Sequence, residues 1–81
     1  MVGYRPAVTP ARVPGPQDDR HVVAHLLAAA GFDRVAAVHD EFADEVERLG
    51  DVASASEHRR EGASLRWRAA VERRTARAAT G

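Results

Sequence analysis

Three stretches of the chain after residue 17 place apolar residues at helical spacing. The first predicts a helix over residues 19–30, because an aspartate at position 18 or 19 can cap its start and Gly31 suits the left-handed position after its end. On a helical wheel of about 100° per residue, one side of this helix is apolar. This predicted core side consists of Val22, Val23, Leu26, Leu27 and Ala30. His21 and His25 fall on the opposite side, where we expect solvent to surround them.

The strongest periodic signal predicts a second helix over residues 34–49, which Asp33 can cap and Gly50 can end. Five apolar residues in this segment are spaced 3, 4, 4 and 3 apart, as in the core-facing stripe of an amphipathic helix. The stripe consists of Val35, Val38, Phe42, Val46 and Leu49. His39 flanks it and should lie at the edge of the core. Because the connection between the two helices is short, we expect an antiparallel or sharply angled hairpin.

A third helix is predicted over residues 55–79, beginning at a capping box in which Ser54 bonds forward and Glu57 reaches back. Its apolar side is thin, and Leu65 points away from it. Trp67 is the one large anchor, which we expect to pack across the hairpin, an exposed contact for a partner being the alternative. The prediction is thus an all-α fold, a helical hairpin plus a longer C-terminal helix in a small three-helix domain over residues 18–81.

All four prolines lie within the first sixteen residues, which predicts an extended arm over residues 1–17. The arm lacks the continuous apolar stretch of a signal peptide. It is either a disordered leader or a docking arm that becomes ordered along a partner's surface. In the second case Tyr4, Val8 and Val13 would make the contacts.

The charges sum to zero over the chain but are unevenly distributed. Residues 33–56 carry seven acidic residues against two arginines, whereas residues 57–81 carry seven arginines against three glutamates. In the basic segment, one helical face carries four arginines at spacings of 7, 7 and 4, namely Arg59, Arg66, Arg73 and Arg77. This stripe could follow a nucleic-acid backbone, or it could dock onto the acidic helix or a neighbouring copy. The overall neutrality favours docking.

Signals for chemistry or membrane insertion are weak. The chain has no cysteine. His21 and His25 are the only histidines at a spacing that could bind one metal ion, and a metal site needs more than two ligands. The core is too thin to shape a pocket, so we expect no enzyme activity, no metal and no cofactor. No continuous apolar run approaches the roughly 18–20 residues of a transmembrane helix, so we expect no contact with a membrane.

These patterns predict a non-enzymatic protein-protein interaction or assembly module that binds another protein or copies of itself. An accessory structural protein of a larger particle, such as that of a bacteriophage, is one such setting. One alternative is a nucleic-acid-associated protein using residues 57–81, and another is a small regulator that binds its target through the acidic helix. We expect the chain in the cytoplasm or within a macromolecular assembly.

Overall fold

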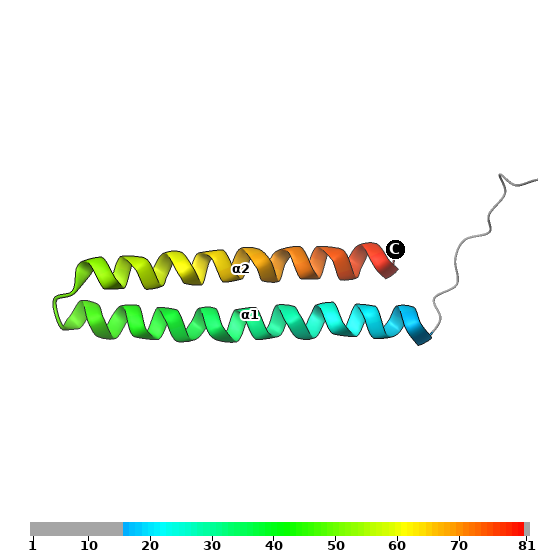
Figure 1. The fold of residues 1–81 in the computed structure, drawn as a ribbon, viewed down its shortest axis with the longest axis horizontal. Coiled ribbons are helices and arrows are strands. Elements are labelled where there is room, and N and C mark those ends of the chain that lie inside the picture. The colour runs from blue at the N-terminus through cyan, green and yellow to red at the C-terminus, as the bar shows by residue number, and fades with distance from the viewer. Residues whose placement is uncertain (1–15, 81) are drawn as a thin grey trace, which may run out of the picture.

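A computed structural model describes residues 16–80, with side chains from Asp19 onward. These residues form two antiparallel helices, α1 (Pro16–Arg48) and α2 (Val52–Thr80), joined by a short turn (Figure 1). The prediction of an all-α fold is confirmed. The proline-rich arm lies outside the described residues, apart from Pro16 and Gln17, which belong to the first turn of α1.

The predicted break at Gly31 is wrong, because α1 runs through it without interruption. The predicted helices over residues 19–30 and 34–49 are therefore one helix, and the described chain has two helices rather than three. A glycine inside a helix costs only about 1 kcal/mol relative to alanine. Continuing the helix instead keeps a single face of α1 against α2 over up to about 43 Å, the length of the 29-residue α2 at about 1.5 Å per residue.

The turn between the helices is built from backbone bonds and one aspartate. Gly50 has a φ of 89°, and its N–H donates to the carbonyl of Glu47 at 2.9 Å while the N–H of Asp51 donates to that of Val46 at 2.9 Å. This is the Schellman arrangement, and the left-handed conformation explains the glycine. The Asp51 carboxylate then accepts the N–H of Ser54 at 3.0 Å, so Asp51 caps α2. The predicted capping box, which starts at Ser54, lies three residues too late.

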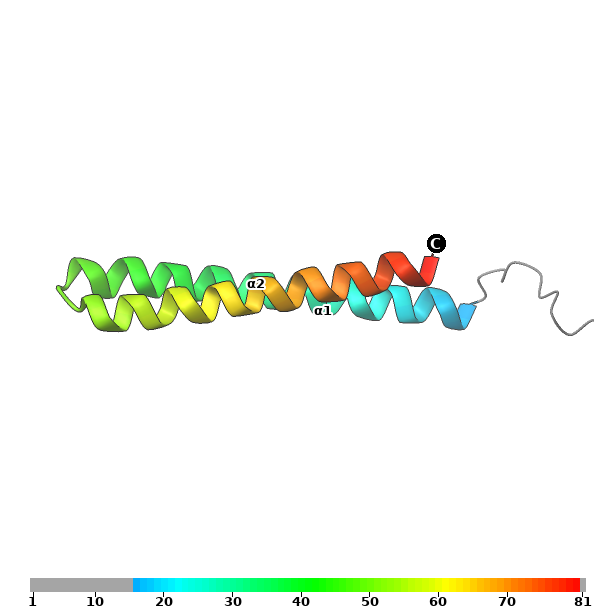
Figure 2. The same ribbon diagram turned by 90° about the horizontal axis from the view of Figure 1, so that it is seen from above.

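Small residues line the contact between the helices at every seventh position. They are Ala29, Ala36 and Ala43 in α1 and Ala55, Gly62, Ala69 and Ala76 in α2, all of them buried. A strict seven-residue repeat winds two helices gently around each other. Figure 2 accordingly shows α1 and α2 crossing at a shallow angle.

The helices approach closely at Gly62. A Cβ atom there would lie 3.0 Å from Oδ1 of Asp40 and 3.4 Å from the backbone carbonyl of Ala36. The absence of a side chain is thus what lets the two backbones meet at this level.

The small-residue contact overturns the predicted core. Leu65, expected to point away, is only 8% exposed because it follows Gly62 by three residues and precedes Ala69 by four. Trp67, two residues further along, turns outward and is 61% exposed. Much of the predicted apolar side of the first helix is also exposed, including Val23, Leu26 and Leu27.

The stripe with the strongest periodicity in the sequence lies largely in solvent as well. Val35, Val38, Phe42 and Leu49 are 48%, 45%, 53% and 77% exposed, and only Val46 among the five has an intermediate exposure. The physical reason is that the alanine side of α1 already occupies the contact with α2, and most of the stripe projects from a different side of the same helix.

Replacing Gly62 by leucine should force the helices apart. We expect Gly62→Leu to lower the free energy of unfolding by about 1–3 kcal/mol, the usual cost of overpacking. Chemical denaturation followed by far-ultraviolet circular dichroism measures the change. Ala63→Leu, at the adjacent exposed position, is the control and should change stability little. Equal effects of the two substitutions would contradict the packing at Gly62.

Candidate functional site

A ladder of ion pairs closes one edge of the helix contact. Three acidic residues of α1 pair with three arginines of α2, and both sets repeat every seven residues. The pairs are Asp33 with Arg73, Asp40 with Arg66, and Glu47 with Arg59. The Arg59 guanidinium also reaches Asp44, at 3.2 Å, and donates to Glu47 at 2.8 Å. Three members of the predicted arginine stripe thus contact the acidic half of α1 within one chain.

These pairs shift the ionisation of their members. The hydrogen bond from Arg66 lowers the pKa of Asp40 below its ordinary value, and the hydrogen bond from Arg59 does the same to the pKa of Glu47. Burial opposes both shifts more weakly than the hydrogen bonds favour them. The same bonds raise the pKa of each arginine. The side chains are 42–49% exposed, so solvent and salt screen the pairs and each contributes only modestly to stability.

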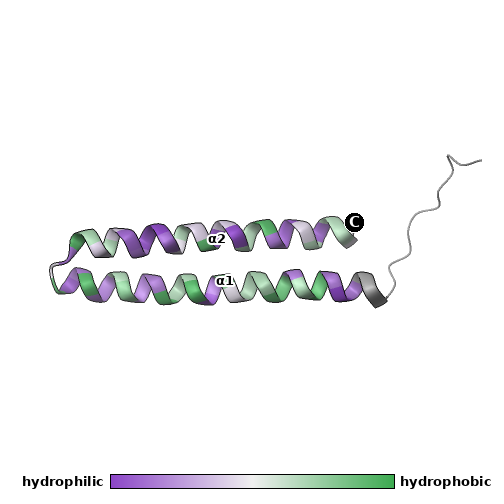
Figure 3. Cartoon of the chain, viewed as in Figure 1, coloured by the Kyte–Doolittle hydropathy of each residue, from purple (hydrophilic) through white to green (hydrophobic). Residues whose placement is uncertain are grey.

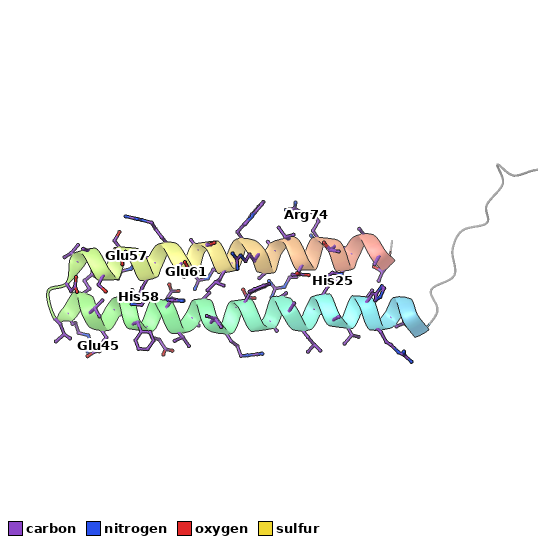
Figure 4. The ribbon with its side chains drawn as sticks, viewed as in Figure 1. His25, Glu45, Glu57, His58, Glu61 and Arg74 are labelled. Carbon is purple, nitrogen blue, oxygen red and sulfur yellow. The ribbon has the colours of Figure 1, made fainter. Side chains whose placement is uncertain are left out.

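Polar residues also lie between the helices beside the small-residue contact. Nδ1 of His25 bonds to the carboxylate of Glu72, and Nδ1 of His39 lies 2.9 Å from Nδ1 of His58. Figure 4 shows the His25 and His58 side chains between the two ribbons. The His39–His58 hydrogen bond needs one ring to donate and the other to accept, so it is lost when both rings are protonated. The expected solvent exposure of His25 is wrong, whereas His39 lies at the edge of the contact as predicted.

An apolar surface, interrupted by Glu45, runs along α1 away from the ion-pair ladder. We call Val35, Val38, Phe42 and Leu49 the α1 apolar face; all four are exposed. Helical geometry places them on the side of α1 opposite Asp33, Asp40 and Glu47. In Figure 3 apolar colouring recurs along α1, whereas polar colouring dominates much of α2.

The same helix has a second notable property. By length and composition alone, the segment Asp19–Arg48 is long and apolar enough to cross a membrane, and little of it is covered by α2. The expectation that no segment qualifies is therefore not supported. The core helices of proteins that never enter a membrane pass the same test, and here Asp33 and Arg34 interrupt the apolar stretch at its middle. This surface could therefore be covered by protein or by lipid.

The other predicted contact residues are dispersed. Trp67 faces outward from α2, with the Arg74 guanidinium 5.8 Å from its ring centroid. Arg77 lines a shallow groove with Val22, Leu26 and Ala76 at the open end of the hairpin. Tyr4, Val8 and Val13 lie outside the described residues. The structure does not bring Trp67 and the arginine ladder together into one site.

Within residues 16–80, no group of three or more metal-binding side chains comes together. The same part of the chain buries no charged or polar residue.

Sequence reasoning missed this surface because it assigned the most periodic stripe to the core. The missing signal was the seven-residue spacing of small residues across the three predicted helices. It is visible as alanines at positions 29, 36 and 43, and again at positions 55, 62, 69 and 76, of which position 62 is glycine. The pairing of His39 with His58 had no signal of its own, since it follows only from the register of the two helices.

Acid should weaken the ladder. Because the folded-state pKa of Asp40 lies below its unfolded value, its pair with Arg66 contributes stability above about pH 4 and loses it as the pH falls through the folded pKa. Asp40→Asn removes this contribution. Between about pH 5 and pH 2 we therefore expect the melting temperature of Asp40→Asn to fall a few degrees less than that of the natural chain.

Thermal melts followed by circular dichroism across this pH range provide the measurement. Glu57→Gln, on an exposed position of α2 outside the ladder, should leave the pH dependence unchanged (Figure 4). If Asp40→Asn and the natural chain lose stability in parallel, the Asp40–Arg66 pair contributes nothing.

In the described structure, the small-residue contact and the ion-pair ladder stabilise the hairpin, and the α1 apolar face remains largely exposed. The comparisons with known proteins add no assignment to this description: no family model matches the sequence, and no curated protein and no solved structure matches it. The functional argument rests on the geometry of the surface itself.

Proposed function

We propose that this protein is a non-enzymatic protein-protein interaction or assembly module and that the α1 apolar face is its contact surface. The observation that carries the proposal is the exposure of Val35, Val38, Phe42 and Leu49 on one side of a single helix. Isolated apolar residues on a surface are ordinary, but a contiguous apolar patch on a small chain marks a binding surface or an aggregation hazard.

The composition of the hairpin core supports the same conclusion. Among the described residues, the buried apolar side chains are alanines and one leucine, and no large side chain is fully buried. Alanine buries little apolar area, so the helix contact alone stabilises the hairpin weakly. Covering the α1 apolar face would add the burial that chains of this size usually need.

The arginine ladder weighs against the nucleic-acid alternative. Arg59, Arg66 and Arg73 contact carboxylates of α1, and a phosphate backbone would have to compete with those carboxylates for them. Trp67, exposed on α2, is available for a second protein contact.

A photo-crosslinking amino acid at position 38, introduced into the chain in its native host, tests the proposal. We expect ultraviolet light to produce covalent adducts with protein, either another copy or a different chain. The control carries the same amino acid at the exposed Arg60 of α2 and should yield far fewer adducts. Absence of protein adducts at position 38, or equal yields at both positions, would contradict a role for the α1 apolar face in assembly.

A further inference from the structure

The α1 apolar face matches itself when reversed end to end. Consider two copies of α1 running antiparallel about a two-fold axis at Val38. Each residue then lies level with the one equally far from Val38 in the opposite direction, so residue 27 meets residue 49 and residue 31 meets residue 45. An antiparallel two-fold pairing of this kind is the commonest symmetry of homo-oligomers, because it uses the same patch twice.

The apolar residues pair well in this register. Val38 lies against Val38 of the second copy, and Val35 lies within one residue, about 1.5 Å along the axis, of the level of Phe42. Leu49, at 77% exposure, lies level with Leu27, at 66% exposure. The most exposed residue of the α1 apolar face therefore lies level with an exposed leucine beyond the other end of the face.

The charges bordering the face pair as well. Arg34 and Glu41 lie seven residues apart on the same side of α1, at the border away from α2. In the reversed copy Arg34 falls within one residue of the level of Glu41, and the symmetry repeats this pair. Glu45, which projects from α1 away from α2 in Figure 4, falls level with Gly31, where no side chain competes for space.

The area is sufficient for a specific contact. From their exposed fractions, the side chains of Leu27, Val35, Val38, Phe42 and Leu49 offer on the order of 1,000 Å² over two copies. A biological interface must bury at least about 1,000 Å² in total, and stable ones usually bury about 1,200–2,000 Å², toward which the alanines and charged side chains around the face contribute.

From the self-matching of apolar residues and charges, we infer that the occupant of the α1 apolar face is a second copy of this chain, bound antiparallel about Val38. This inference rests on the proposed function and names its partner. A lipid surface fits less well, because the hydrocarbon region of a bilayer offers no charged partner to Arg34 or Glu41 at the border of the face, whereas a second copy supplies one to each.

Charge reversal tests the pairing. Arg34→Glu places glutamate against Glu41 twice per dimer and should weaken self-association about tenfold, as should Glu41→Arg. The double variant Arg34→Glu/Glu41→Arg restores both pairs and should recover the natural dissociation constant. Arg60→Glu, on the exposed side of α2, is the control and should leave it unchanged.

Sedimentation equilibrium of the purified full chain over a range of concentrations measures these constants. A monomer at every concentration, or a dimer in which the double variant is no better than the single ones, overturns the inference. Because the chain has no cysteine, a second measurement is direct: a short bis-maleimide should link Val38→Cys into covalent dimers but not Arg60→Cys.

The outcomes separate this inference from the proposed function. If the purified chain stays monomeric while the crosslinker at position 38 captures a different protein in the host, the dimer is refuted and the assembly role stands. If the monomer instead co-sediments with phosphatidylcholine/phosphatidylglycerol vesicles and position 38 captures no protein, both are refuted.

Discussion

The close approach of α1 and α2 through small residues is the constraint on which the rest of the molecule depends. Ala36 lies against Gly62, and the small residues seven positions before and after each of them are also buried in the contact. At these levels only small side chains lie between the two backbones. This proximity fixes the rotation of each helix about its own axis. With that rotation set, carboxylates of α1 come within reach of the arginines of α2 along one edge, and histidines meet Glu72 and each other alongside the contact.

The same rotation determines what remains outside. The large apolar residues of α1 cannot enter a contact that alanine already fills, so Val38 and its neighbours project from the opposite edge. Small-residue packing and solvent-screened ion pairs therefore hold the hairpin together. Most of the strongly hydrophobic side chains remain exposed and can be buried only against another surface. A neutral chain with a weak internal core and a rich external apolar face is suited to association, and this division links the fold to the proposed role.

Much of this fold was predictable from the sequence, but not which side of each helix contacts the other. The helical content, the turn at Gly50 and the docking of Arg59, Arg66 and Arg73 onto an acidic helix all follow from local signals and charge. The break at Gly31 was predicted wrongly because a glycine ends a helix only where no other interaction stabilises its continuation. Here the seven-residue contact with α2 extends past Gly31 on both sides. Phe42 was assigned to the core by the helical spacing of its stripe, and Trp67 by its size. Large apolar side chains favour burial, but close packing of two helices favours alanine at the contact. A single sequence does not show which of these two tendencies decides the side of the helix that is buried.

The central claim is that the hairpin packs through its alanines and leaves most of the α1 apolar face uncovered by α2, although the Phe42 ring lies 5.7 Å from the His58 ring between centroids. Nuclear Overhauser contacts in the isotope-labelled chain test it most directly. The account predicts contacts between the Ala36 methyl group and the α-protons of Gly62, and between Ala29 and Ala69, with none from the Phe42 ring to the Trp67 indole. Strong contacts between Phe42 and Trp67, with Ala36 and Gly62 apart, would show a hairpin packed through its large residues and would contradict the account.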